Sequence, residues 1–210
     1  MHLDIRQIRH LKSFFDDKTI DPIHISATKT IVQPATVGKV VNGTYTTEYN
    51  KWCTAEFVDY SSFSDQVNAA IKKVQTEVEN LYKVSCLDYE IHFLKYADGA
   101  EYKSHIDGQL IANNVASRAV NRDITAVIYL NEDYRGGVLH FDLFDLSYTP
   151  KKGDVLIYPT TYEYVHHVSK VEGIRYAIVI WFRTSPELNV TKSLDQNTAF
   201  YLQRLINYKD

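Results

Sequence analysis

Cysteine is scarce in this chain of 210 residues, where only Cys53 and Cys86 occur. Their spacing matches no metal-binding cysteine motif, so we expect two reduced thiols in a reducing cytosol, and a disulfide is the less favoured alternative. No run of eighteen apolar residues is present, and the first residues lack the basic and then apolar order of a signal peptide. These absences predict a cytoplasmic protein without a membrane partner.

A strong charge of either sign is also missing, because the formal net charge is −3. This value gives no support for a surface that binds nucleic-acid phosphates. Repeats and low-complexity segments are absent as well, and 45% of the residues are apolar. A chain of this length can bury one sizeable core. We therefore expect one structural domain, with a supporting segment over residues 1–85, a core over residues 86–183 and a tail over residues 184–210.

The hydrophobic pattern predicts one long helix followed by many short strands. Apolar residues recur at steps of three and four over residues 62–83, which is typical of an amphipathic helix. From residue 88 onward, short β-rich runs alternate with Gly, Asn and Asp turns, which indicates a sandwich or jelly roll. Residues 27–50 favour a loop or an exposed hairpin, and residues 194–208 a short helix. The predicted fold is mainly β with flanking helices: a double-stranded β-helix (jelly roll) with an N-terminal helix packed on one sheet.

His105 and Asp107 carry the clearest chemical signal. Residues two apart on a strand share a face, so these two side chains can hold one metal ion together while Ile106 points away. His166, 61 residues further on, completes a set of three ligands on one side of the ion. This is the two-histidine, one-carboxylate arrangement of non-haem Fe(II) oxygenases. The His-x-Asp pair alone would be interpreted as an ordinary surface pair; His166 and Arg175 argue against that.

The segments around these residues resemble one family over residues 86–183. They are Tyr96, Gly99 and Tyr102 before His105-Ile106-Asp107, then Thr125 to Asn131, Tyr134 to Phe141, Pro150 to Pro159, and His166 to Tyr176. In these segments the chain is similar to the Fe(II)/2-oxoglutarate dioxygenases, and within them to the prolyl 4-hydroxylase-like group. Two departures are visible. Lys170 stands where the family usually has proline, and the spacing from His166 to Arg175 is one residue shorter than the commonest one.

The resemblance implies an iron centre on the three candidate ligands, with no catalytic residue beyond the metal. It implies 2-oxoglutarate as co-substrate, dioxygen as oxidant and ascorbate as reductant. The family pattern H-x-V-x-x-V assigns the ligand role to His166, and His167 is then a neighbour that faces the other way. His92 and His140 carry no ligand pattern and are interpreted as structural residues.

Strand alternation predicts where Arg175 points. In residues 174–183 the odd-numbered positions share one face, which directs Arg175 and Trp181 into the barrel, and the even-numbered ones, from Ile174 to Phe182, pack outward against the helices. A buried guanidinium requires an anionic partner, because an unpaired buried charge is very costly. That partner is either an Asp or Glu of the chain or, as the resemblance implies, the distal carboxylate of 2-oxoglutarate.

Two further groups of residues are candidates for the site. A phenol can donate a hydrogen bond to a carboxylate, so the candidate co-substrate contacts are Tyr96, Tyr102 and Tyr129. With sixteen tyrosines in the chain, core packing is the alternative for each. The candidate substrate-proximal residues are Trp181, Arg118 and Arg122. The segment 108–123 and residues 27–50 are expected to border the substrate entrance, since loops on a rigid scaffold usually set specificity.

The expected function is hydroxylation of an unactivated C–H bond, with a prolyl residue of a peptide or protein as the substrate that the resemblance implies. Trp52, Tyr102 or Trp181 could stack on the pyrrolidine ring. The alternatives are a hydroxylase of a free amino acid or small metabolite on the same fold, a nucleic-acid demethylase, and a non-catalytic metal-binding jelly roll. Demethylases of this type usually place a second arginine six residues after the first, where this chain has Trp181. We therefore expect no nucleic-acid partner.

Overall fold

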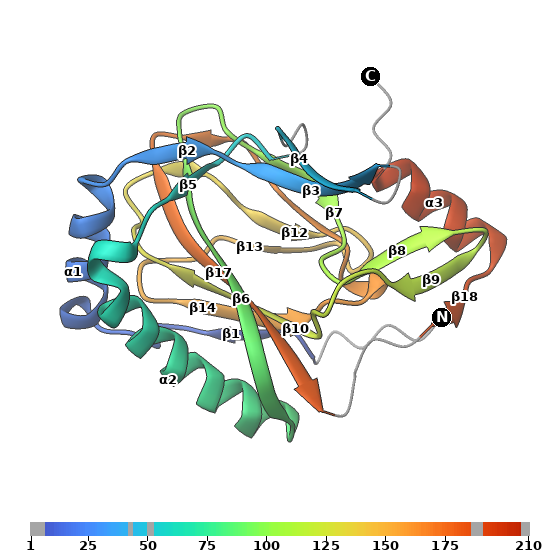
Figure 1. Ribbon diagram of the computed structural model, residues 1–210, viewed down its shortest axis with the longest axis horizontal. Helices are drawn as coiled ribbons and strands as arrows, with labels where there is room; N and C mark the ends of the chain where they lie inside the picture. The colour runs from blue at the N-terminus through green and yellow to red at the C-terminus, as the bar shows by residue number, and fades with distance from the viewer. Residues whose placement is uncertain (1–6, 42–43, 50–52, 186–190, 207–210) are drawn as a thin grey trace.

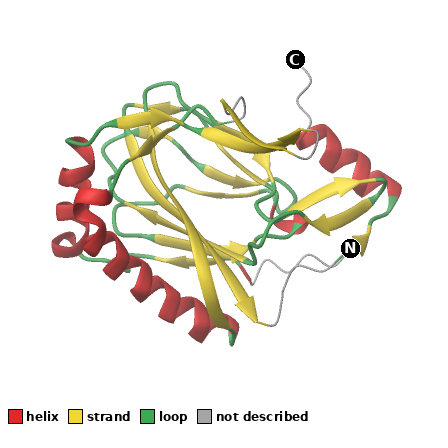
Figure 2. Cartoon of the chain, viewed as in Figure 1, coloured by secondary structure: helices red, strands yellow, loops and turns green. Residues whose placement is uncertain are grey.

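The computed structural model describes residues 7–41, 44–49, 53–185 and 191–206. Strands form a layered body, with helices along one side and another helix at the opposite end (Figure 2). The helices in this part of the chain are α1 (Asp17–Thr28), α2 (Ser64–Tyr82) and α3 (Gln196–Ile206), with short 3-10 turns η2 (Ser61–Phe63) and η3 (Tyr162–Tyr164). The predicted helix over residues 62–83 is thus present as α2.

The larger sheet has seven antiparallel strands in the order β1-β14-β10-β17-β6-β5-β2. Their bounds are β1 (Arg9–Leu11), β14 (Val155–Pro159), β10 (Ile124–Tyr129), β17 (Arg175–Ser185), β6 (Ser85–Tyr96), β5 (Glu56–Val58) and β2 (Val32–Pro34). The long strands β6 and β17 pair along almost their whole length near the middle of the sheet. The sheet therefore offers one face to the helices and the other to the interior (Figure 1).

The smaller sheet has the order β13-β12-β15-β7 and faces the inner side of the larger one. Its strands are β13 (Leu146–Tyr148), β12 (Leu139–Phe141), β15 (His166–Val168) and β7 (Tyr102–His105). Side chains of both sheets meet in one buried cluster, which includes Leu94, Val127, Leu139 and Phe141. Two facing antiparallel sheets are the predicted jelly roll, and this prediction is confirmed.

Short strands complete the described part. They are β8 (Gln109–Ala112), β9 (Val115–Arg118) and β18 (Lys192–Ser193) in one sheet, β11 (Arg135–Gly136) with β16 (Val171–Glu172), and β3 (Thr36–Val41) with β4 (Thr44–Tyr49). β3 and β4 form a hairpin inside the range 27–50, where a loop or hairpin was predicted. Trp52 lies outside the described residues.

Helix α2 covers the outer face of the larger sheet, so the predicted N-terminal helix on one sheet is confirmed. Its buried stripe is Val67, Ala70, Ile71, Val74 and Val78. This stripe packs in one cluster with the even-numbered positions of β17, Tyr176, Ile178, Ile180 and Phe182. Full burial of each such aliphatic side chain contributes roughly 1.5–3 kcal/mol. Packing of the two apolar faces therefore holds the helix on the sheet.

One position of the predicted outward face differs. Ile174 is 45% exposed, because β17 begins one residue later, at Arg175. The preceding Gly173 has a φ of +99°, so the chain turns here and the strand alternation does not yet apply. The prediction that Ile174 packs against the helices is therefore wrong.

The C-terminal helix and the two cysteines agree with the expectations from the sequence. Helix α3 lies within the predicted range 194–208, and its Leu202 is buried against Ala116 and Tyr162. Cys53 and Cys86 are both free thiols. Among the described helices, none combines the length and the apolar character that a membrane crossing requires.

Gly153 is a point where the fold tolerates no side chain. Its φ is +81°, and a Cβ there would lie 2.3 Å from the carbonyl oxygen of Phe15. We expect Gly153→Ala to lower the free energy of unfolding by roughly 2–4 kcal/mol, because a backbone clash adds to the cost of a positive φ. Gly99→Ala is the control: its φ is +79° with nothing within 4 Å, so about 1 kcal/mol is expected. Urea unfolding measures both, and equal losses would contradict the clash.

Candidate metal centre and adjoining cavity

The structure brings His105, Asp107 and His166 together. His105 is the last residue of β7 and His166 the first of β15, and the two are register partners in the smaller sheet. Nε2 of His105 lies 3.5 Å from one carboxylate oxygen of Asp107, and Nε2 of His166 lies 3.9 Å from the other. The three ligand atoms are all within 4.8 Å of one another. Within the described residues, no other group of three His, Cys, Asp or Glu meets this condition.

The rings of the two histidines are oriented in the same way, by a hydrogen bond from Nδ1 to a backbone carbonyl. Nδ1 of His105 lies 2.8 Å from the carbonyl oxygen of Lys103, and Nδ1 of His166 lies 2.9 Å from that of Tyr164. A carbonyl only accepts, so each Nδ1 carries the proton and each Nε2 keeps its lone pair. Both lone pairs therefore face the space between the three side chains, as metal ligation requires.

Protonation also favours ligation at neutral pH. Burial lowers the pKa of His166 to about 4, and the neighbouring His105 adds to this effect. Burial alone would raise the pKa of the Asp107 carboxyl, but His166 and His105 and a 2.7 Å hydrogen bond from the Thr125 hydroxyl hold this pKa well below its usual range. At pH 7 the site thus presents one carboxylate and a neutral His166, which are the forms that bind a metal.

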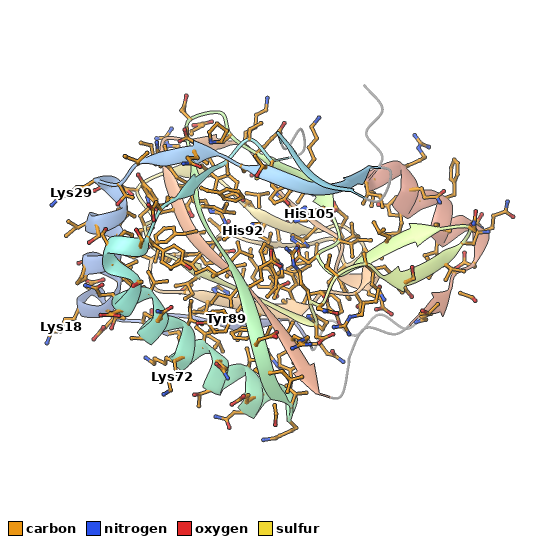
Figure 3. The ribbon with its side chains drawn as sticks, in the orientation of Figure 1. Lys18, Lys29, Lys72, Tyr89, His92 and His105 are labelled. Carbon is orange, nitrogen blue, oxygen red and sulfur yellow. The ribbon has the colours of Figure 1, made fainter. Side chains whose placement is uncertain are left out.

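A cavity of about 390 Å³ adjoins the three side chains and reaches the inner face of the larger sheet. Figure 3 shows His92 and His105, which both line it, in the middle of the molecule, whereas Lys18, Lys29 and Lys72 project outward from the helices. A cavity of this size fits a small organic ligand. The metal ligands and a ligand-sized space are therefore contiguous.

Arg175 lies in the wall of this cavity with only 2% of its surface exposed. Its guanidinium carbon is 4.7 Å from the ring centre of Tyr96 and 5.1 Å from that of Tyr129. Among the described residues no carboxylate pairs with it, and Nε and Nη1 have no hydrogen-bond partner. A salt bridge to an Asp or Glu of the chain, one of the two alternatives considered for Arg175, is thus absent from the described part of the chain.

The surroundings of Arg175 hold further unpaired donors. The hydroxyls of Tyr129 and Tyr134 are buried and have no hydrogen-bond partner among the described residues. A Cβ at Gly137 would lie 3.0 Å from both the Arg175 side chain and the Tyr134 ring, so the glycine makes room for them. A buried guanidinium beside two unpaired phenols is a site that an anionic ligand would satisfy.

The three candidate tyrosines all line the cavity. Tyr96 and Tyr129 flank Arg175 as described, whereas Tyr102 stacks on the His105 ring with centroids 3.8 Å apart. Tyr102 is therefore nearer to the metal ligands than to the guanidinium. The packing alternative also applies in part, because Tyr96 and Tyr129 belong to the buried cluster between the sheets.

Trp181 and Arg122 lie together in another part of the cavity wall. The Arg122 guanidinium carbon is 3.7 Å from the Trp181 ring centre, and Glu90 accepts hydrogen bonds of 2.9 and 2.6 Å from Arg122. His92 packs edge-on against Trp181 at 4.7 Å. The interpretation of His92 as a purely structural residue is incomplete, because its ring forms part of the cavity wall.

Arg118 has a different position from the expected one. It is not part of the cavity wall, and its Nη1 lies 3.0 Å from a carboxylate oxygen of Asp123, which is fully buried. Asp123 also accepts a 2.8 Å hydrogen bond from the backbone of Thr184. A buried carboxylate requires such a partner, so this ion pair accounts for Arg118 without a substrate.

His167 points away from the metal ligands. Its Nδ1 lies 2.8 Å from the Asp142 carboxylate, and its ring stacks on His140 with centroids 4.5 Å apart. His140 in turn lies 2.6 Å from the Ser147 hydroxyl. Of the two adjacent histidines, only His166 reaches the three-residue group.

Three cavity or ligand contacts were not foreseen from the sequence: Thr125, Tyr134 and Tyr158. Thr125 hydrogen-bonds Asp107 from β10, and Tyr158 contacts His166 from β14. Each lies in a segment that carried the family resemblance, but no spacing within these segments points to the partner. Strand pairing brings Thr125 and Tyr158 to the metal ligands, and the loop before β11 brings Tyr134 to Arg175.

Sequence comparison agrees with the site. The sequence model of the 2OG-Fe(II) oxygenase superfamily matches residues 91–183. A PKHD-type hydroxylase of Crocosphaera subtropica is 29% identical over 158 residues, which cover 69% of this chain and 67% of the relative. A PKHD-type hydroxylase of Cupriavidus pinatubonensis is 28% identical over 122 residues, covering 56% of this chain and 53% of the relative. The second alignment thus spans about half of that relative's length.

Solved structures share the fold. A prolyl-4-hydroxylase of Pseudomonas putida has a TM-score of 0.62 at 19% identity, covering 84% of this chain and 92% of that one. A prolyl hydroxylase of Trichoplax adhaerens, in complex with a peptide fragment of a hypoxia inducible factor, also has a TM-score of 0.62, at 15% identity, covering 89% and 87%. Residues 91–183, which contain all three candidate ligands and Arg175, are thus the part of the chain that matches the 2OG-Fe(II) oxygenase superfamily.

Proposed function

We propose that this protein is an Fe(II)- and 2-oxoglutarate-dependent dioxygenase that hydroxylates an unactivated C–H bond of a prolyl residue in a peptide or protein. The oxygenase assignment depends on one observation: a single cavity is lined both by three converging ligand atoms and by a buried guanidinium that has no anionic partner among the described residues. The superfamily match supports the chemistry. The prolyl substrate rests on the resemblance to the prolyl 4-hydroxylase-like group.

The residues fit the metal. His105, Asp107 and His166 would hold Fe(II) through two Nε2 lone pairs and one carboxylate, a donor set typical of non-haem iron. Carbonyl oxygens of the chain orient both rings, and Thr125 orients the carboxylate. Bound iron supplies the oxidising chemistry, in which 2-oxoglutarate and dioxygen give succinate, carbon dioxide and one oxygen atom for the substrate. Ascorbate is the reductant that keeps such iron ferrous.

The residues also fit the co-substrate. Arg175 would bind the distal carboxylate of 2-oxoglutarate, because its guanidinium can form two parallel charge-assisted hydrogen bonds with one carboxylate. The Tyr129 hydroxyl, which has no partner among the described residues, would donate to the same group. Tyr96 supports the guanidinium from its ring face. The low exposure of Arg175 keeps water from competing for these bonds.

A free amino acid is the second candidate substrate. Glu90 and Arg122 place one carboxylate and one guanidinium together in the cavity wall, near Trp181. A zwitterion would have to exchange partners with this ion pair, and it carries both charges that the exchange requires, whereas a peptide-bound prolyl group carries neither. A proline-rich peptide has the advantage of a stiff backbone, which loses little entropy on binding.

One experiment separates these candidates. The protein is incubated with Fe(II), ascorbate and 2-oxoglutarate, together with either proline-rich peptides or free L-proline, and mass spectrometry detects the gain of one oxygen on the ring. We expect hydroxyproline in the peptide, with one succinate formed for each hydroxylation, and no product with His166→Ala. Succinate formation that a non-proline metabolite stimulates, without oxygen on any proline peptide, would reject the prolyl substrate and retain the oxygenase.

A further inference from the structure

The hydroxyl of Tyr158 lies against the metal-binding atom of His166. Tyr158 is in β14, has 1% of its surface exposed and lines the cavity. Its oxygen is 3.1 Å from Nε2 of His166. Phe141 packs on the ring at 83° with centroids 4.9 Å apart, so the phenol is held between the two sheets. Neither the family resemblance nor the spacing of the ligands assigns this residue a role.

The direction of this hydrogen bond follows from the tautomer of His166. Nδ1 faces the carbonyl oxygen of Tyr164 at 2.9 Å, so Nδ1 carries the proton and Nε2 has only a lone pair. The Tyr158 hydroxyl must therefore be the donor. The hydroxyl is thus aimed at the Nε2 lone pair, which is the lone pair that a metal ion would require.

Metal ligation and this hydrogen bond exclude each other. When Nε2 binds a metal, the Tyr158 hydroxyl loses its acceptor, and in the described part of the chain His166 is the partner that this hydroxyl has. A buried hydroxyl without a partner costs about 1–3 kcal/mol in general. The phenol would remain next to the metal position, where an oxygen atom of a small molecule bound to the metal could accept its hydrogen bond.

We propose that Tyr158 is part of the metal centre and changes its acceptor on metal binding, from Nε2 of His166 to an oxygen atom of the 2-oxo acid that chelates the metal. The inference rests on the proposed function. It assigns a donor to the metal end of the co-substrate, whereas Arg175 serves the distal end. Tyr158 thereby orients the chelating group relative to the three protein ligands.

The test uses the full chain with Mn(II), which is stable in oxygen, and isothermal titration calorimetry in two steps. Mn(II) is titrated into metal-free protein, and 2-oxoglutarate is then titrated into the Mn(II)-loaded protein. Tyr158→Phe keeps the ring and removes only the hydroxyl. We expect it to bind Mn(II) within threefold of wild type or more tightly, because the competing hydrogen bond is gone. We expect it to bind 2-oxoglutarate about threefold to thirtyfold more weakly.

Tyr148→Phe is the matched control, since Tyr148 also packs edge-on against Phe141 but is not part of the cavity wall. Both of its affinities should equal those of wild type. If Tyr158→Phe binds Mn(II) more than threefold more weakly, Tyr158 only supports the fold, and the inference is overturned. Unchanged 2-oxoglutarate affinity overturns it as well, while the proposed function stands. If wild type itself shows no 2-oxoglutarate binding that depends on Mn(II), the proposed function fails first.

Discussion

His166→Ala is expected to lower the affinity for Mn(II) or Fe(II) by at least about 100-fold, whereas His167→Ala is expected to leave it nearly unchanged. Loss of a direct ligand should exceed the tenfold to hundredfold effect of removing an outer-sphere partner. His166 shares the ligand group with His105 and Asp107, but His167 faces Asp142 instead. His105→Ala and Asp107→Ala should therefore behave like His166→Ala.

Isothermal titration with Mn(II) measures this difference directly, and thermal unfolding of each metal-free variant shows whether it is folded. His140→Ala is a second control, because His140 stacks on His167 outside the ligand group. Normal binding by His166→Ala together with lost binding by His167→Ala would reverse the assignment of the ligand.

Arg175→Ala is expected to leave Mn(II) binding nearly intact and to raise the half-saturating concentration of 2-oxoglutarate by roughly thirtyfold to a thousandfold. A charge-assisted, two-point contact in a buried pocket is worth about 2–4 kcal/mol, which corresponds to that range. The guanidinium is buried and has no carboxylate partner among the described residues. Removing it therefore breaks no ion pair of the described fold and acts on the ligand.

Arg175→Lys should recover part of the affinity, because lysine keeps the charge but not the planar fork. Arg183→Ala is the matched control on the same strand, where the side chain pairs with Asp88 at the surface. Succinate release measured against 2-oxoglutarate concentration gives the half-saturation for each variant. An unchanged value for Arg175→Ala would mean that the distal carboxylate binds elsewhere.

Strand alternation was a reliable guide where the strand is regular. The even-numbered residues 176–182 pack against the helices, and Arg175 and Trp181 line the cavity. It was wrong at Ile174, because the first residue of a strand depends on where the preceding turn ends. The His-x-Asp pair illustrates the same limit: β7 ends at His105, and Asp107 lies in the turn beyond it. The two side chains still converge on one point, although Asp107 lies outside the strand.

The sequence by itself determined the fold class, the helix predicted over residues 62–83 and the set of four polar residues that the cavity brings together, because these depend on local periodicity and on ordered motifs. Only the tertiary structure decided how strands distant in the chain pair. That pairing places the Tyr158 hydroxyl on His166 and the Thr125 hydroxyl on Asp107, and the loop before β11 places the Tyr134 ring beside Arg175. Such contacts join residues with no characteristic spacing, since they depend on register between strands and on which donors remain unpaired after packing.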